Sequence, residues 1–165
     1  RRRRTLFAAD ARQLRALIPD ISLSTDIIIG FPGETEEDFQ QTASLMREVA
    51  YDNAYIFKYS PRPGTDAAAN EDDVPKEVKE ARNQALLALQ DEIALKRFRR
   101  FEGQTVEVLM EGLGRREGQW FGRTRGNHGV IVESKERLTG QTMRVRITNV
   151  TAKKLFGERC PSSSR

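Results

Sequence analysis

The chain has 165 residues, of which 38% are apolar and 32% charged, a composition typical of one average globular domain or two small ones. No apolar run is long enough to cross a membrane and no signal peptide is visible, so we expect a cytoplasmic protein without a membrane partner. One cysteine, Cys160, excludes a disulfide framework, and one histidine, His128, excludes a zinc site built by this chain alone.

The N-terminal part of the chain predicts alternating helices and strands. Helices are expected at 8–18, 35–51 and 75–103, and strands at 21–29 and 54–59. The segment 35–38 (TEED) resembles a capping box at the start of the second helix. The unbroken apolar run at 27–29 is typical of a strand covered on both faces, as in a parallel sheet. Two parallel strands are too few for an independent domain, so we expect this part to belong to a larger α/β barrel or sheet.

From Gln104 onward the pattern changes to short β segments separated by glycines. Strands are expected at 105–110, 119–125, 129–133, 143–150 and 154–158, which predicts a small five-stranded β-barrel. Residues 102–165 hold twelve Lys/Arg and seven Asp/Glu, a net charge of +5, whereas residues 1–101 have a net charge of −1. A basic module of this kind is typical of proteins that bind a polyanion such as nucleic acid.

Polar residues and turns follow both predicted strands of the N-terminal part. Asp26 lies within the first strand, where it serves either as a ligand contact or in a structural hydrogen bond. Gly30 begins a turn at the carboxyl end of that strand, the end at which parallel α/β proteins bind ligands, although a tight strand-to-helix turn explains it equally. Ser60 and Arg62 occupy the equivalent loop after the second strand, where two prolines stiffen the backbone.

The β module combines aromatic and basic residues. In the segment 120–128, at least one of Trp120 and Phe121 should belong to the core, because neighbours on a strand point to opposite faces. His128 is expected to be a surface contact rather than a catalyst. Arg144 and Arg146 alternate along one strand and so share a face, and Lys153 follows. Basic residues near aromatic rings are typical of RNA binding.

Three segments resemble one family. Residues 24–39 (STDIIIGFPGETEEDF) and 57–65 (FKYSPRPGT) resemble the radical S-adenosylmethionine methylthiotransferases, and Gly122-Arg123-Thr124 with Asn127 resembles the TRAM domain that ends those enzymes. The matches follow the family's order and extend over nearly the whole chain. The loop at 59–65 is most similar to the MiaB branch, which modifies tRNA.

The resemblance implies a partial TIM-type barrel and a defined reaction. One 4Fe-4S cluster cleaves S-adenosylmethionine, and the resulting radical attacks C2 of an N6-isopentenyladenosine next to the anticodon. A second 4Fe-4S cluster delivers sulfur, and another S-adenosylmethionine supplies the methyl group. The TRAM domain is expected to bind the tRNA anticodon stem-loop.

The cysteine motif that holds the family's radical cluster is not found in this sequence. We therefore expect a C-terminal piece, monomeric and inactive by itself, whose cluster ligands lie outside this chain, with no catalytic residue or metal ligand within it. Residues 1–101 would supply the last two β/α units of the barrel, 102–159 the five-stranded, OB-like TRAM domain, and 160–165 a disordered tail. Part of the family's fifth-strand pattern persists at Ile28 and Gly30, whereas Asp26 and Gly33 replace its outer Gly and Glu.

The resemblance also implies residue roles. Asp26, Ile28 and Gly30 would contact S-adenosylmethionine, and Ser60 and Arg62 would face the substrate at the barrel mouth. The residues expected to contact tRNA are Arg123, Thr124, Arg125, Asn127, Arg144 and Lys153.

Three alternatives stay open at this point. The chain could belong to the branch that acts on threonylcarbamoyladenosine. It could be a stand-alone RNA-binding module with a vestigial α/β segment. It could also be a structural interaction protein with no role in RNA binding.

Overall fold

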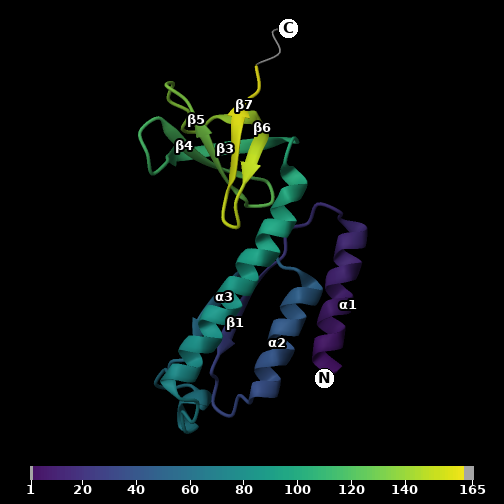
Figure 1. Ribbon diagram of the computed structural model, residues 1–165, viewed down its shortest axis with the longest axis vertical. Helices are drawn as coiled ribbons and strands as arrows, with labels where there is room; N and C mark the ends of the chain where they lie inside the picture. Colours follow the sequence, from purple (N-terminus) through teal and green to yellow (C-terminus); the bar gives the residue numbers. More distant parts are fainter. Residues whose placement is uncertain (1, 162–165) are drawn as a thin grey trace. The chain divides into compact units, whose positions relative to one another are not determined.

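The computed structural model describes residues 2–161, with side chains from residue 6 onward, and these form two compact units (Figure 1). Unit 1 extends to Ile93 and unit 2 begins at Ala94. The domain boundary at 101/102 stays a prediction. Most of the predicted tail, at 162–165, lies outside the described residues. Within the described part, no helix is both long and apolar enough to cross a membrane.

Unit 1 is built on a two-stranded parallel sheet. Its elements are α1 (Arg2–Leu17), β1 (Ser24–Ile29), α2 (Glu36–Val49), β2 (Asn53–Lys58), the short 3-10 helix η1 (Asp66–Ala69) and the first part of α3 (Lys76–Phe98). Ser24 pairs with Asn53 at one end of the sheet and Ile29 with Lys58 at the other. The strand–helix–strand order confirms the predicted α/β character, although α1 begins earlier than expected and β1 is shorter.

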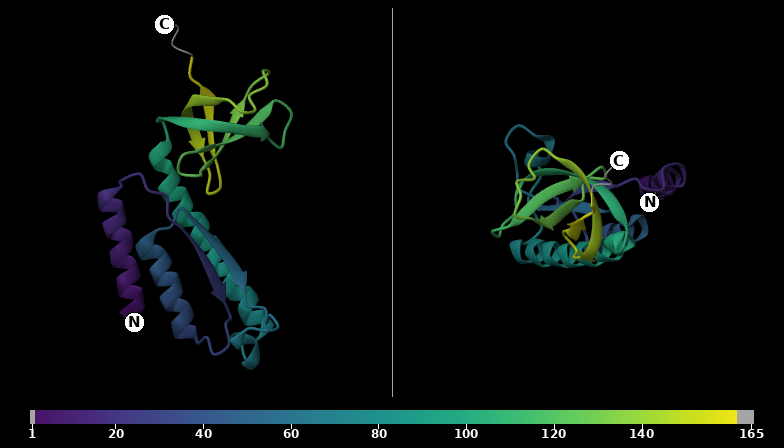
Figure 2. Two further views of the ribbon diagram at one scale, coloured as in Figure 1. Left: turned by 180° about the vertical axis from the view of Figure 1, so that it is seen from behind. Right: turned by 90° about the horizontal axis from the view of Figure 1, so that it is seen from above.

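Within the described part of the chain, only one face of this sheet is covered. Ile29 is fully buried and packs with Met46 of α2 and Leu86 of α3, and Figure 2 shows both helices alongside the strands. On the other face Ile28 is 55% exposed, next to Phe57 at 53%. The prediction of a strand covered on both faces is therefore wrong for the described residues, because side chains alternate along β1 and the described helices pack on only one side.

Side chains fix both ends of α2. Asp38 N donates to Thr35 Oγ1 (3.2 Å) and Thr35 N donates to Asp38 Oδ2 (3.1 Å), which completes the predicted capping box. The Thr35 hydroxyl also donates to Asp38 Oδ2 (2.6 Å), and this bond, with that from the Thr35 N–H, holds the pKa of Asp38 below its ordinary value. At the other end, Arg15 of α1 donates to the carbonyl of Ala50 (2.8 Å), so α1 is tied to the last turn of α2.

Unit 2 is a closed five-stranded barrel, as predicted. After the last turns of α3 and the 3-10 helix η2 (Arg99–Phe101) come β3 (Thr105–Leu113), β4 (Gln119–Thr124), β5 (Gly129–Glu133), β6 (Thr142–Val150) and β7 (Leu155–Arg159). The strands pair in the order β3-β4-β5-β7-β6, and only β5 and β7 run parallel. Figure 2 shows this ring of strands from above.

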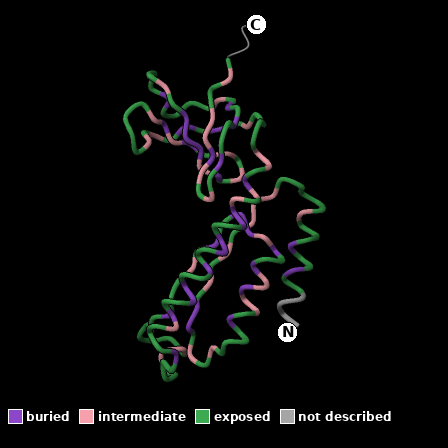
Figure 3. Tube along the Cα trace, viewed as in Figure 1, coloured by how far each residue is buried: buried purple, intermediate pink, exposed green. Residues whose placement is uncertain are grey.

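Apolar side chains fill the barrel interior. Val108, Ile147 and Leu155 have no exposed surface, and buried positions recur along the barrel strands in Figure 3. Trp120 points inward and donates its indole N–H to the carbonyl of Ser134 (3.0 Å). At Gly157 a Cβ would lie 2.5 Å from the carbonyl oxygen of Arg146, so only glycine allows β6 and β7 to approach this closely.

Candidate nucleic-acid interface

The turn between β4 and β5 carries most of the residues predicted to contact tRNA. Thr124 N donates to the carbonyl of His128 (3.0 Å), and Asn127 N donates to the carbonyl of Thr124 (2.9 Å). Asn127 has a φ of +63°, a left-handed conformation that asparagine tolerates better than most residues. Thr124 Oγ1 also lies 3.1 Å from His128 Nδ1. Thr124 and Asn127 therefore shape this turn, whatever they contact outside it.

His128 is buried, and the expectation of a surface contact is wrong. It is 5% exposed, and its ring lies 5.1 Å from that of Phe98 and 4.9 Å from that of Phe101. Its hydrogen bonds to Thr124 fold the end of the hairpin so that the imidazole faces these two rings. The residue is part of the packing that supports the turn.

Arg123 lies on the outside of the barrel with two polar partners. It donates to Asn127 Oδ1 (2.8 Å) and through Nε to Glu111 Oε2 (3.2 Å), and its side chain is 44% exposed. The ion pair with Glu111 offsets part of the charge that a phosphate would otherwise meet. Arg123 is thus held in position by the protein itself.

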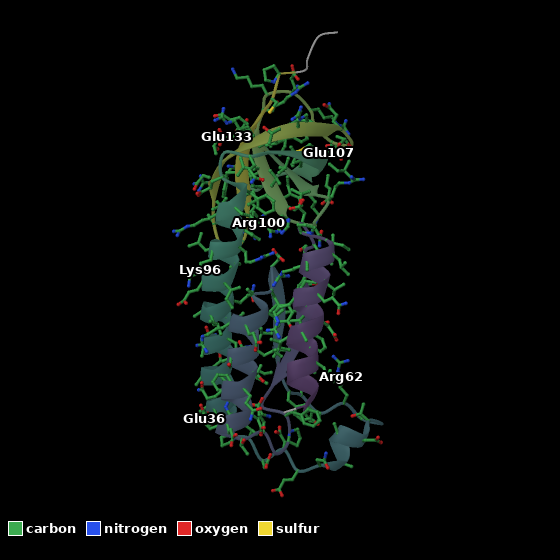
Figure 4. All side chains as sticks on the ribbon, turned by 90° about the vertical axis from the view of Figure 1, so that its right-hand side faces the viewer. Glu36, Arg62, Lys96, Arg100, Glu107 and Glu133 are labelled. Carbon is green, nitrogen blue, oxygen red and sulfur yellow. The ribbon has the colours of Figure 1, made fainter. Side chains whose placement is uncertain are left out.

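The outer surface of β3 brings carboxylates among the predicted basic residues. Glu107 lies opposite Arg144 in the β3–β6 ladder and points outward (Figure 4). A shallow hollow of about 350 Å³ lies on this face. It is lined by Glu107, Leu109, Glu111, Arg123, Thr124, Arg125, Asn127 and Thr142. The face is therefore mixed in sign, which sequence reasoning missed because it had no register between β3 and β6.

The remaining predicted contacts are all exposed. Arg144 and Arg146 flank the buried Val145 on β6, so they share the outer face as expected. Arg125 lies in the β4–β5 turn, and Lys153 lies in the β6–β7 turn, where its N–H donates to Thr151 Oγ1 (3.3 Å).

Phe121 is the outward-facing aromatic residue of β4, next to the inward-facing Trp120. The ammonium of Lys154 lies 4.5 Å from its ring centroid, and the guanidinium carbon of Arg123 lies 5.3 Å away. The ring edge passes over Gly129, where an added Cβ would approach to 3.0 Å. Lys154 was not among the predicted contacts. Its link to Phe121 joins β4 to the turn before β7, and the spacing along the sequence does not reveal it.

In unit 1 the turn after β1 is bound to α3 by a buried ion pair. Gly30 N donates to Glu34 Oε2 (2.7 Å), and the same oxygen accepts from Arg82 Nη1 (2.7 Å). The side chains of Arg82 and Glu34 are 8% and 10% exposed. This pair gives the turn a structural role that the sequence alone could not separate from ligand binding.

Gly30 itself is closely surrounded by protein. Its φ is +67°, and a Cβ there would lie 2.4 Å from Cγ of Lys79. The Lys79 ammonium pairs with Asp72 and lies 5.3 Å from the ring centroid of Tyr59. Glycine is needed here to let the lysine stem pass, so the side of Gly30 that lacks a Cβ is not open to a cofactor.

Asp26 and Ile28 lie on the exposed face of the β1–β2 sheet. They stand opposite Tyr55 and Phe57 in the ladder. Asp26 is exposed and so does not require the buried partner that its apolar strand suggested. Ser60 and Arg62 are exposed in the loop after β2, where the carbonyl of Arg62 accepts the Thr65 hydroxyl (2.8 Å; Arg62 is labelled in Figure 4).

The described residues do not fit an iron–sulfur cluster. Among residues 2–161, no three His, Cys, Asp or Glu side chains gather into a group that could hold a metal ion. The single cysteine, Cys160, is half-buried, with Sγ 3.8 Å from Thr105 Oγ1.

Comparison with known proteins gives consistent matches. Residues 99–159 match the TRAM domain family. The chain is 48% identical to a tRNA-2-methylthio-N(6)-dimethylallyladenosine synthase of Methylacidiphilum infernorum, over 93% of this chain and 33% of that protein. Proteins of the same name from Thermus thermophilus (47% identity, 94% of this chain, 34% of that protein) and Chloroflexus aurantiacus (49%, 94%, 33%) are similarly close.

A solution structure of a conserved protein of Methanococcus maripaludis is 30% identical, covering 36% of this chain and 80% of that one, with a TM-score of 0.32. The chain spans about one third of the length of the curated relatives it matches. Over nearly its whole length the chain is therefore similar to about one third of the length of proteins named tRNA-2-methylthio-N(6)-dimethylallyladenosine synthase, and its last part matches the TRAM domain family.

Proposed function

We propose that the complete protein adds a methylthio group to C2 of N6-isopentenyladenosine next to the anticodon of tRNA, and that this chain provides part of its tRNA-binding surface. The observation that carries the proposal is the identity of 47–49% with synthases named for that product, over 93–94% of the chain. Those names favour the dimethylallyl substrate over threonylcarbamoyladenosine.

The reaction chemistry belongs to parts of the protein outside the described residues. S-adenosylmethionine and two 4Fe-4S clusters would supply the sulfur and methyl transfer. The described residues bring together no group of three potential metal ligands, and Asp26 and Ile28 are the exposed side chains that could border S-adenosylmethionine. Gly30 would act there through the backbone shape of its turn. Ser60 and Arg62 would face the substrate from the neighbouring loop.

Unit 2 would bind the anticodon stem-loop of tRNA. Arg123, Arg125, Arg144 and Lys153 lie outside the barrel and would contact phosphates, while Thr124 and Asn127 position the turn that carries the first two. Phosphate contacts of this kind supply affinity and fix orientation on the RNA. We place the reaction in the cytoplasm and expect a monomer.

Product analysis tests the reaction. A strain without the complete gene should accumulate tRNA that carries the isopentenyl group but lacks the 2-methylthio group, measured by mass spectrometry of hydrolysed tRNA. Reintroducing the gene should restore the product. If the 2-methylthio nucleoside persists in the deletion strain, the proposed activity is wrong.

Salt dependence tests the binding surface. If about six phosphates are contacted, the affinity of the 165-residue chain for tRNA should fall about a thousandfold between low and moderate salt. Replacing Arg123 and Arg125 with alanine should weaken binding and reduce the slope by roughly one per lost contact. The matched control is Arg47→Ala, which removes an exposed arginine of α2 in unit 1. An effect of equal size in the control would contradict the assigned surface.

A further inference from the structure

One aromatic side chain of unit 2 is placed differently from its neighbours. Phe98 and Trp120 belong to the barrel core, and Phe101 packs against that core. Phe121 lies outside this cluster, on the outer face of β4, and is half-buried. Its ring is supported by the edge contact with Gly129 rather than by the barrel interior.

Two cations approach this ring from different strands. Arg123 is two residues further along β4, and Lys154 reaches the ring from the turn that precedes β7. Gly129 lies between these two cations in the sheet. It pairs with Arg123 in the β4–β5 ladder. The next residue, Val130, pairs with Leu155, which follows Lys154, in the β5–β7 ladder. A ring with a guanidinium and an ammonium beside it presents a stacking surface and two phosphate partners at one point.

Two carboxylates lie on the β3 side of this ring, close to Arg123. Glu111 and Glu107 project from β3, which is the neighbour of β4 opposite to β5. A phosphate backbone that crossed β3 would meet these carboxylates. A backbone that crosses from Arg123 over Gly129 to Lys154 passes instead above a residue without a side chain.

We propose that Phe121 is the platform on which one unpaired base of the bound RNA stacks, with Arg123 and Lys154 binding the phosphates on either side of that base. The proposal rests on the tRNA-binding role given above and assigns its point of base contact. Stacking accepts any base, because every base has a π face, so Phe121 selects unpaired loop nucleotides over duplex rather than a particular sequence. The Lys154 ammonium leaves the ring for a phosphate when the base arrives.

The test uses the 165-residue chain and an RNA hairpin whose loop carries the fluorescent adenine analogue 2-aminopurine. Phe121→Leu should weaken hairpin binding about 5- to 100-fold and abolish the quenching that stacking produces, without changing the salt slope. Phe121→Tyr should keep both affinity and quenching. Lys154→Gln should retain stacking in the bound state but reduce the salt slope by roughly 0.7 to 0.9.

The matched control is Leu113→Ala, which alters an exposed apolar side chain at the end of β3, outside the lining of the hollow. It should bind the hairpin as the unaltered chain does. Equal affinity and quenching in Phe121→Leu and the unaltered chain would overturn the platform but leave the proposed function intact. If the unaltered chain fails to bind the hairpin at any salt concentration, both proposals are wrong.

Discussion

The sheets of the two units differ in whether their strand edges are paired. In unit 2 every barrel strand has two neighbours, so no strand edge is left open, and residues such as Val108 and Leu155 are fully buried. In unit 1 the sheet has two strands, and its uncovered face leaves Ile28, Tyr55 and Phe57 more than half exposed. A closed barrel pairs the backbone N–H and C=O groups of all its strands, whereas an open sheet leaves strand edges unpaired and must be stabilised by other means.

Those other means are side-chain links between elements. The Glu34–Arg82 pair joins the turn after β1 to α3, and Arg15 joins α1 to the end of α2. Unit 1 adds these links to the apolar packing around Ile29, whereas unit 2 encloses its apolar side chains within the closed ring. The comparison teaches that the two units should respond to different substitutions. The four changes below break or sharpen that difference, from the largest expected effect to the smallest.

Arg82→Ala should destabilise unit 1 most. The variant leaves the buried carboxylate of Glu34 without its cation, which costs about 3–5 kcal/mol of unfolding free energy. Helical circular dichroism during urea unfolding, which is dominated by unit 1, should show the loss. The control is Arg12→Ala, which removes an exposed ion pair with Glu48 and should cost less than about 1 kcal/mol. Equal losses in both variants would contradict a special role for the buried pair.

Leu155→Ala should act on unit 2 instead. Removing this fully buried side chain should lower the unfolding free energy by about 2–5 kcal/mol. Trp120, the single tryptophan, lies in the barrel core, so its fluorescence reports the unfolding of unit 2. Ile28→Ala, on the open face of unit 1, should change stability by no more than about 0.5 kcal/mol. A large loss from Ile28→Ala would show that the open face is covered in solution.

Thr35→Ala should cost about 1 kcal/mol through loss of the α2 cap. The effect should depend on pH. Because the folded-state pKa of Asp38 is lowered, its hydrogen bonds stabilise the fold above the unfolded-state pKa and are lost as the pH falls through the folded value. Urea unfolding at neutral pH and at successively more acidic pH should therefore show the variant and the unaltered chain converging in acid. If the difference in unfolding free energy between the variant and the unaltered chain stays constant with pH, Asp38 does not contribute to the effect.

Glu111→Gln should have the smallest effect, and it should be favourable. It releases Arg123 from its ion pair and removes a carboxylate from the barrel surface, so tRNA affinity should rise about two- to tenfold. Fluorescence anisotropy at low salt measures this. Glu133→Gln makes the same change in net charge elsewhere on the outside of the barrel (Figure 4). An identical gain in both variants would mean that only net charge matters.

Local features of this fold could be predicted from the sequence. The strand at Gly129–Glu133 has its predicted bounds, and the capping box at Thr35 forms as expected, because both depend on neighbouring residues alone. The inward position of one of Trp120 and Phe121, and the shared face of Arg144 and Arg146, follow from strand alternation.

Features that depend on distant partners could not be predicted. The burial of His128 depends on Phe98 and Phe101, which precede it by more than twenty-five residues. The Phe121–Lys154 contact depends on which strands pair. Likewise, nothing local at 27–29 indicates that a covering layer is present on only one side of the strand. The fold class was therefore predictable, but the surface that carries the candidate site was not.

The parallel pairing of β5 and β7 has a consequence for how the protein is made. β5 ends at Glu133, but its partner β7 runs from Leu155 to Arg159. β3 likewise pairs with β6, which is synthesised later. During synthesis the ring cannot close until residues through Arg159 have left the ribosome. Until then β3, β4 and β5 expose an unpaired edge and the apolar side chains that later fill the interior. Pairings so distant in sequence form slowly, so the nascent barrel is most exposed to aggregation just before its final strand emerges.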